Sequence, residues 1–134
     1  MKRFIVSLDF DGTLVRTDRY PVFDPTPLPG CLETLEWLKE EHGAQFILLT
    51  QRDMCRMSGG PYNKTVLEEA IDWCTDHGIE LVGVNECPGQ YSWSKSRKVY
   101  SDIIIDDHCA GIDLDENECV DWIKLRKWLE WKLG

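Results

Sequence analysis

The stretch that decides the fold is Phe4-Ile-Val-Ser-Leu-Asp9-Phe-Asp11-Gly12-Thr13-Leu14-Val15, close to the start of the chain. Residues 4–8 are mostly apolar and do not alternate with polar residues, which is typical of a parallel strand buried on both faces. Two aspartates and a glycine follow directly, and glycine allows a tight turn in which the backbone approaches an anion closely. The stretch therefore predicts a buried strand that delivers carboxylates to a turn at its carboxyl end.

Further apolar segments repeat this strand pattern, and amphipathic segments lie between them. Strands are predicted over 44–49, 81–84 and 103–105, and helices over 31–42, 65–77 and 119–133. Apolar residues at helical spacing mark the helices, and Thr65 with Glu68 forms a capping-box pattern. The alternation predicts the α/β class: a single Rossmann-like domain of three layers, α/β/α, with a central parallel sheet.

Length and charge narrow the classes of protein and partner. A chain of 134 residues predicts one domain, 1–134, and its formal net charge of −9 repels nucleic acids and anionic membranes at long range. We therefore expect no membrane partner, and nucleic acid only as a phosphorylated substrate. Trp128 and Trp131 can belong to the core or to an oligomer contact, which leaves the oligomeric state open.

Localisation is inferred from two further features. No apolar run reaches the roughly 18 residues of a membrane span. The apolar segment after Lys2 and Arg3 ends at Asp9, too early for a secretory signal. The six cysteines are irregularly spaced and form no C-x-x-C pair. Reduced thiols in a cytoplasmic protein are the expectation.

Oxygen-bearing side chains follow three of the predicted strands. Asp9 and Asp11 follow the first strand, Thr50 the second, and Asp106 and Asp107 the last. Because ligands bind beyond the carboxyl ends of the strands in an open parallel sheet, we expect these groups to meet in one crevice. Four clustered carboxylates need a compensating cation, and Mg²⁺ is a hard ion that carboxylates and phosphate oxygens hold together. The sequence thus predicts a Mg²⁺ site that takes a phosphorylated substrate.

The motifs resemble those of the haloacid dehalogenase superfamily. The strand followed by Asp9-Phe-Asp11-Gly12-Thr13 is similar to its first motif, Thr50 to its second, Lys98 to its third, and Asp106-Asp107 to its fourth. Small hydrolases of this superfamily from bacteria and phages resemble the chain in further segments, which are Thr50-Gln-Arg52, 67–74 and 96–107. The resemblance covers essentially the whole chain and implies a phosphatase-like hydrolase that acts on phosphoric monoesters.

The resemblance also implies the catalytic roles. Asp9 would be the nucleophile that attacks phosphorus and forms an aspartyl phosphate. Asp11 would first protonate the leaving oxygen and then deprotonate the attacking water. Lys98 would balance the negative charge of Asp9 and the transferring group, with Lys95 as the alternative lysine.

Binding of phosphate and metal is assigned by the same resemblance. Phosphoryl oxygens would be bound by Thr50 and by the backbone around Asp11 and Gly12, and Gly12 and Thr13 would be substrate-binding residues. The ligands of Mg²⁺ would be Asp9, the backbone carbonyl of Asp11, Asp106 and Asp107, the last directly or through water.

Arg52 is a further candidate because it lies just beyond Thr50. Its planar guanidinium could bind a second phosphate of the substrate in a bidentate manner. The alternative is a salt bridge to Asp53 or to another neighbouring acid.

The intervals between the motifs are too short for an inserted cap domain, so we expect a site open to bulky substrates. Segments 51–62 and 85–97 are loops that could border it. Two alternatives to a hydrolase remain: phosphoryl transfer to an acceptor other than water, and a non-catalytic module that binds phosphate or metal. A two-component receiver domain is disfavoured, because the third strand ends in Asn85 rather than in a phosphoacceptor aspartate.

Overall fold

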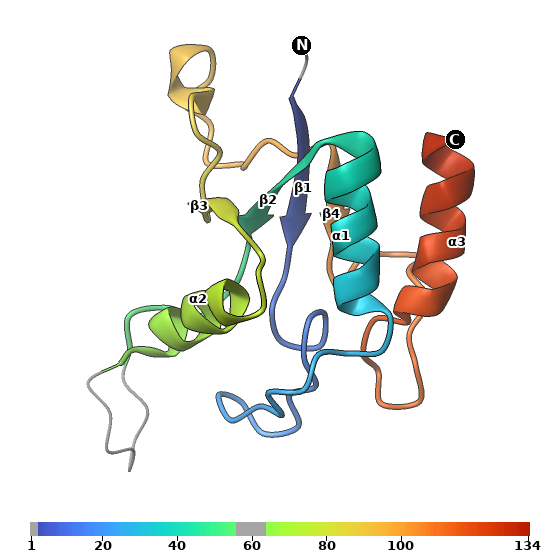
Figure 1. Cartoon of the computed structure of the whole chain (residues 1–134). Coiled ribbons are helices and arrows are strands. Elements are labelled where there is room, and N and C mark those ends of the chain that lie inside the picture. Colours follow the sequence, from blue (N-terminus) through green and yellow to red (C-terminus); the bar gives the residue numbers. More distant parts are fainter. Residues whose placement is uncertain (1–2, 56–63) are drawn as a thin grey trace.

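The computed structural model describes residues 3–55 and 64–134. Within them the order of elements is β1 (Phe4–Leu8), α1 (Cys31–His42), β2 (Ala44–Leu48), α2 (Val66–Asp76), β3 (Leu81–Val84), the 3₁₀ helix η1 (Gln90–Ser92), β4 (Ile103–Ile105) and α3 (Trp122–Leu133). The strands form one parallel sheet in the order β3-β2-β1-β4 (Figure 1). The predicted α/β class, a Rossmann-like domain with a central parallel sheet, is confirmed.

Strand β1 lies between β2 and β4 because its sequence can be buried on both faces. Ile5, Val6 and Leu8 are fully buried. Ser7 is buried as well, and its hydroxyl is hydrogen-bonded to the hydroxyl of Ser101 in the segment before β4. A polar side chain inside the sheet is tolerated here because it has this partner.

The three helices of the described residues contribute to one hydrophobic core on one face of the sheet. This core joins Val6 and Leu8 of β1 to buried side chains of every helix: Leu35 and Leu38 of α1, Ala70 and Trp73 of α2, and Leu125 and Leu129 of α3. The connections β1-α1-β2 and β2-α2-β3 move in the same direction along the sheet. Right-handed crossovers in the same direction place α1 and α2 on the same face.

The opposite face is covered by the crossover segment 85–102, which returns from β3 to β4. Cys87, Val99 and Tyr100 of this segment pack against Ile5 and Ile47. Because this connection moves back across the sheet, the right-handed rule places it on the face opposite to α1 and α2. The third layer of the prediction is therefore present, but the loop predicted over 85–97, with the short turn η1, forms it in place of the helices that an α/β/α arrangement implies.

Capping residues set the ends of the helices. Helix α2 begins as the capping box predicts, with the Thr65 hydroxyl accepting a hydrogen bond from the N–H of Glu68 at 3.1 Å. Helix α3 begins at Trp122, later than the predicted start at 119. The reason is Asp121, whose carboxylate accepts from the N–H of Lys124 at 3.1 Å and caps the helix there.

The carboxyl ends of the strands lie together at the lower edge of the sheet in Figure 1. In residues 3–55 and 64–134 no added domain lies between β1 and α1 or between β2 and α2, which agrees with a capless arrangement. No helix of the described residues has the length and the apolar character needed to cross a membrane.

Candidate active site

Three of the predicted carboxylates meet at the carboxyl ends of β1 and β4. These strands are neighbours, with Leu8 opposite Ile105, so Asp9 and the pair Asp106-Asp107 leave the sheet side by side. Asp9 hydrogen-bonds the side chain of Asp107 and lies within electrostatic range of Asp106. We call Asp9, Asp106 and Asp107 the aspartate cluster.

The cluster is short of positive charge. The pKa of Asp9 is raised to about 8, mainly by burial and in addition by the hydrogen bond with Asp107 and the charge of Asp106. Burial is also the largest cause of the raised pKa of Asp106. Raised pKa values in adjacent carboxyl groups indicate a site that favours either bound protons or a cation.

Thr13 and Gly12 hold the cluster in place. The Thr13 hydroxyl lies 3.3 Å from Asp9 Oδ2 and 3.4 Å from Asp107 Oδ1, and it accepts from the N–H of Asp107 at 3.1 Å. Gly12 has a φ of +76°, and a Cβ atom there would lie 2.6 Å from Asp107 Oδ2. Only glycine therefore allows Asp107 to approach the turn this closely.

The predicted role of Gly12 and Thr13 in binding phosphate through their backbone is corrected by the structure. The N–H of Gly12 donates to the Val15 carbonyl at 2.8 Å, and that of Thr13 to the Phe10 carbonyl at 3.2 Å. Both amides are used within the turn, so these two residues position the aspartates instead of presenting free donors to a phosphate.

The turn is also held from a distant part of the chain, which the sequence did not predict. The N–H of Val120 donates to the Gly12 carbonyl at 2.9 Å. The indole Nε1 of the buried Trp122 donates to the Thr13 carbonyl at 2.6 Å. Helix α3 therefore supports the geometry of the site through its first residue.

Asp11 does not join the aspartate cluster; its carboxylate is paired with Arg52. The guanidinium donates from Nε to Oδ2 at 2.8 Å and from Nη2 to Oδ1 at 2.8 Å, which is a bidentate pair. The hydroxyl of Thr17 donates to Oδ1 at 2.6 Å. A side-chain role of Asp11 as a metal ligand is thus not supported, whereas its backbone carbonyl remains a candidate ligand.

The predicted role of Arg52 in binding substrate is corrected by the same observation. Arg52 is 2% exposed, and its guanidinium also donates from Nη1 to the Val66 carbonyl at 3.1 Å and from Nη2 to the Pro21 carbonyl at 2.8 Å. Its guanidinium carbon lies about 5 Å from the rings of Phe10 and Phe23, at 5.0 and 5.1 Å. The salt-bridge alternative is correct, although the acid is Asp11 and not Asp53.

Thr50 lies beside this ion pair. Its hydroxyl accepts from the N–H of Arg52 at 3.1 Å, and its own N–H donates to Asn85 Oδ1 at 2.9 Å. The hydroxyl proton of Thr50 remains a possible donor to a phosphoryl oxygen. Most of the predicted loop 51–62, from residue 56 on, lies outside the described residues.

Lys98 is placed at the other end of the sheet, which corrects its predicted role. Its carbonyl accepts from Nε2 of Gln90 at 2.8 Å. Gln90 belongs to η1, which Figure 1 shows near the amino end of β1. A chain that is about to enter a parallel strand must first return to the amino ends of the strands. Lys98 comes shortly before Ile103, so it lies far along that return path, and Lys95 belongs to the same segment.

The aspartate cluster fits a hard divalent cation. Its carboxylate oxygens are the donors that Mg²⁺ prefers, and the raised pKa of Asp9 reflects its burial beside other carboxyl groups. The exposed His108 comes within 3.7 Å of Asp107 through Nε2, and its ligand atom lies within 4.8 Å of those of Asp106 and Asp107. Asp9, Asp106 and Asp107 could therefore hold Mg²⁺, with His108 at the rim.

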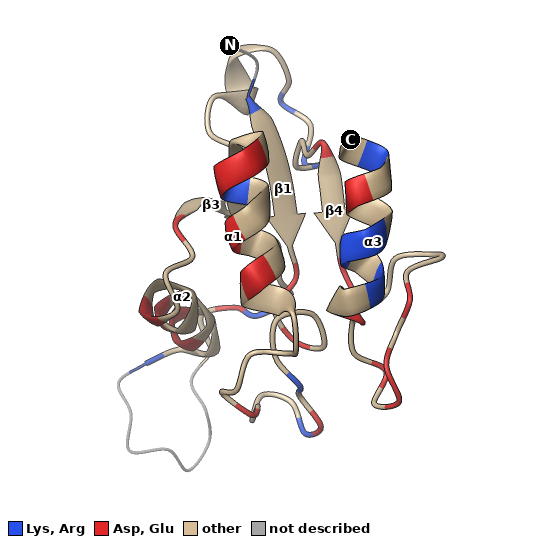
Figure 2. Ribbon diagram, turned by 45° about the vertical axis from the view of Figure 1, so that its right-hand side comes forward, with Lys and Arg blue, Asp and Glu red and all other residues tan. Residues whose placement is uncertain are grey.

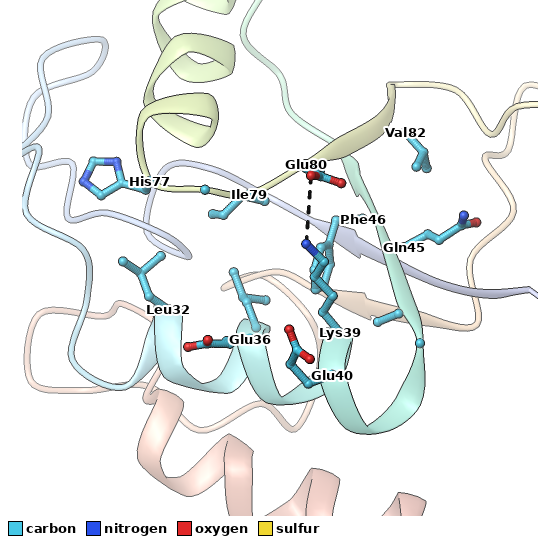
Figure 3. A pocket seen from close by; sticks show the side chains of 14 residues that line it. Leu32, Glu36, Lys39, Glu40, Gln45, Phe46, His77, Ile79, Glu80 and Val82 are labelled. Atoms are coloured by element: carbon cyan, nitrogen blue, oxygen red, sulfur yellow. Dashed lines mark ion pairs between the residues drawn. The ribbon is translucent and has the colours of Figure 1, made fainter.

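A separate hollow of about 620 Å³ lies between α1 and the turn from α2 to β3 (Figure 3). Lys39 and Glu80 face each other across it at 4.0 Å. The hollow includes Ala44, the first residue of β2, and none of the aspartate cluster. It is therefore not the candidate active site.

Comparison with solved structures shows a protein that the chain resembles over nearly its whole length. The chain is similar to a solved structure of a conserved protein from Bacteroides thetaiotaomicron, with 30% sequence identity and a TM-score of 0.71. The similarity covers 98% of this chain and 93% of the other chain. No protein-family model matches the chain, and no curated protein matches it.

Proposed function

The chain belongs to the same family as this conserved Bacteroides protein, and we propose that it is a Mg²⁺-dependent hydrolase of phosphoric monoesters. The observation that supports the proposal most is the aspartate cluster, in which a buried carboxylate at the end of β1 meets two carboxylates at the end of β4. The resemblance of the motifs to the haloacid dehalogenase superfamily points to the same activity.

In the proposed reaction Asp9 is the nucleophile. A carboxylate oxygen of Asp9 forms a bond to phosphorus while the bond from phosphorus to the leaving oxygen breaks, which gives an aspartyl phosphate. A water molecule then attacks the phosphorus, returns the Asp9 carboxylate and releases inorganic phosphate. Thr13 orients Asp9 for the first step through its hydroxyl.

Asp11 is the proposed proton carrier, and Arg52 determines which of its oxygens is available. Oδ1 accepts from both Arg52 Nη2 and Thr17, whereas Oδ2 accepts from Arg52 Nε. We assign the proton transfer to Oδ2, the less engaged oxygen. Arg52 is a positioning residue in this scheme, since it fixes the plane of the Asp11 carboxylate and is itself buried.

Mg²⁺, held by Asp9, Asp106 and Asp107, would neutralise the cluster and the phosphoryl oxygens. Thr50 would donate its hydroxyl proton to a phosphoryl oxygen. The absence of a cap in the described residues permits a large leaving group, so the substrate panel should include bulky molecules.

The experiment is a panel of phosphorylated metabolites, nucleotides, phosphopeptides and 5′- or 3′-phosphorylated oligonucleotides, assayed with Mg²⁺ and with a chelator. We expect release of inorganic phosphate that requires Mg²⁺ and is lost in Asp9→Asn. Appearance of phosphate on an added alcohol instead of in solution would indicate transfer to another acceptor. Turnover that is unchanged in Asp9→Asn would contradict the proposal.

A second candidate, a metal-binding module without turnover, is favoured by two observations. Lys98 does not reach the cluster, and both oxygens of Asp11 are engaged by Arg52. This candidate predicts that Mg²⁺ stabilises the chain while no phosphate is released from any substrate of the panel. A burst of phosphoenzyme that can be labelled on Asp9 would exclude it.

A further inference from the structure

One side of the molecule, formed by β4 and α3, combines an open strand edge with exposed aromatic side chains. Strand β4 is the last strand of the sheet beside β1, and Ile104 is 42% exposed. On α3, Trp128 is 48% and Trp131 is 77% exposed, so neither belongs to the core. Large apolar side chains gathered on one surface indicate an interaction site.

A groove of about 520 Å³ lies on this side between the strand and the helix. Its apolar lining includes Ile103, Ile105, Leu125 and Trp128, and the loop after β4 closes one end. We call the groove, Ile104 and the exposed face of α3 with Trp128 and Trp131 the β4–α3 edge.

The backbone of β4 is open toward this side. Ile105 accepts from the N–H of Asp9 in the direction of β1. Because backbone groups alternate in direction along a strand, those of Ile104 point away from β1. The Cys109 thiol donates to the Ile104 carbonyl, with 3.8 Å between Sγ and the carbonyl oxygen.

The other end strand, β3, has features that discourage association. It pairs with β2 through a register shift between Phe46 and Ile47. Glu80 and Glu86 flank it in sequence. Irregular pairing and charged residues are common ways in which proteins protect strand edges. Strand β4 is flanked by acids as well, Asp102 and Asp106, but it pairs with β1 without a register shift.

Charge is divided along the β4–α3 edge. Helix α3 carries Lys124, Arg126, Lys127 and Lys132 and one acid, Glu130, which pairs with Arg126, whereas segment 113–118 before it is acidic (Figure 2). Helix α3 runs opposite to β4, since Lys132 near its end and Asp102 before β4 line the same groove. The amino end of β4 therefore lies beside Lys132 and Asp102, with Lys127 farther along α3, and the carboxyl end lies beside Lys124 and the acidic segment. The acidic segment carries four acids, so the balance of charge differs between the two ends.

We infer that the β4–α3 edge binds a second copy of this chain about a two-fold axis. Such an axis, perpendicular to β4, sets the two edge strands antiparallel. It brings Lys127 and Lys132 of each copy to the acidic segment 113–118 of the other, and it buries Trp128 and Trp131 of both copies. The inference does not depend on the proposed function.

The division of charge favours a second copy over other occupants. A uniformly acidic partner would attract the lysines of α3 but would be repelled by segment 113–118. A uniformly basic partner would attract segment 113–118 but would be repelled by the lysines. A two-fold pair matches both ends at once, because each surface carries the complement of the other. The net charge of −9 opposes association in general, so a dimer must rely on this local match.

The test is the mass of the full chain in solution by sedimentation equilibrium, over concentrations from about 1 to 200 μM, a range that detects micromolar dissociation constants. We expect a reversible dimer. Trp128→Asp should weaken it at least about tenfold, as expected for an aromatic residue at the centre of an interface. Trp93→Asp is the matched control, because Trp93 is 61% exposed but lies in the crossover segment; it should leave the dimer unchanged.

Charge-reversal variants distinguish the proposed two-fold dimer from nonspecific association. The double variant Lys127→Glu, Lys132→Glu should weaken association, and adding Asp115→Lys, Glu116→Lys should restore it. Circular dichroism of each variant checks that the fold is retained, and Trp131→Asp replaces Trp128→Asp if that variant unfolds. A chain that is monomeric at all these concentrations, or a dimer that Trp128→Asp, Trp131→Asp and the charge exchange leave unchanged, would overturn the inference.

Discussion

Asp9 and Asp11 share one turn, yet their surroundings are opposite. Asp9 faces other acids, and burial among them raises its pKa to about 8. Asp11 faces a base, and Arg52 engages both of its oxygens. The buried Phe10 lies between them and anchors the turn in the core.

The difference shows how one motif can produce two kinds of carboxylate. Around Asp9 the neighbouring side chains are acids, so this part of the turn favours a bound cation. Such a cation would keep the Asp9 carboxylate ionised, as a nucleophile must be. Around Asp11 the positive charge comes from Arg52, whose guanidinium orients the carboxylate for the proposed proton transfer. Each of the following experiments perturbs one side and compares it with the other.

The largest effect is expected for Asp9→Asn. Its amide is a poor nucleophile and a weak metal ligand, so phosphate release should fall by about 10³-fold or more, as when a nucleophile is removed from other enzymes. Without Mg²⁺ the same variant should unfold at a higher temperature than the native chain at pH 8, because a buried like-charge contact is removed. A kinetic assay and a thermal melt check the two parts; a variant less stable than the native chain would contradict the account of the cluster.

Breaking the Asp11 side should mainly cost stability. Arg52→Met leaves a carboxylate without its buried partner, and we expect a loss of about 3–5 kcal/mol in the free energy of unfolding. Arg16→Ala is the matched control, since Arg16 forms a surface ion pair with Asp18 and is 44% exposed; its loss of stability should be much smaller.

The Arg52 variant also distinguishes positioning from substrate binding. Losses in kcat should be equal for the preferred substrate and for p-nitrophenyl phosphate, and Asp11→Asn added to Arg52→Met should recover part of the stability. Urea unfolding and steady-state kinetics measure these quantities. A rise in KM for the preferred substrate alone would return Arg52 to the role of a phosphate ligand.

Mg²⁺ should act on the Asp9 side only. If it binds the folded cluster and not the unfolded chain, a concentration 100 times Kd stabilises by about 2.7 kcal/mol. We expect the melting temperature to rise with Mg²⁺ in the native chain and in Asp11→Asn, and to be insensitive to Mg²⁺ in Asp106→Asn. A rise that persists in Asp106→Asn would place the ion elsewhere.

The pH dependence of stability follows from the sign of the Asp9 shift. Its pKa in the folded chain, about 8, is above the ordinary value of 3.8, so between these values the folded chain holds a proton that the unfolded chain has lost. Its contribution to stability is complete below pH 3.8 and is lost as the pH rises toward 8, by at most about 1.4 kcal/mol per pH unit for one proton. Unfolding measured without Mg²⁺ should show this slope in the native chain and a shallower slope in Asp9→Asn. An equal slope in both would contradict the assignment.

The smallest effect is expected for Thr13→Val. The variant removes a hydroxyl that bridges Asp9 and Asp107 and leaves the Asp107 N–H without its acceptor, at a cost of about 1–2 kcal/mol. Thr75→Val is the control, because the Thr75 hydroxyl bonds an exposed helix carbonyl. If the two variants lost the same stability, Thr13 would have no special role in the cluster.

Local sequence was sufficient to predict most of the framework. The strands at 81–84 and 103–105 and the helix at 31–42 have the predicted bounds, since apolar periodicity and capping are properties of neighbouring residues. The start of α3 was missed because Asp121, and not the apolar pattern, sets it. The loop over 85–97 was predicted, but its position on the second face of the sheet was not, because the direction of a crossover depends on the order of the strands, which periodicity does not contain.

The sequence by itself determined that acids lie at the carboxyl ends of β1 and β4, because each apolar strand and its acids are only a few residues apart in the chain. Tertiary structure decided which of these acids has a basic partner and which has only other acids as neighbours. Arg52 reaches Asp11 only after β2 is placed beside β1, and Lys98 is excluded from the cluster because its segment must return to the amino end of β4. Strand order likewise decided that Ile104 is at an open edge beside Trp128. Electrostatic partners depend on distances in space, and residues far apart in a chain acquire those distances only when the sheet forms.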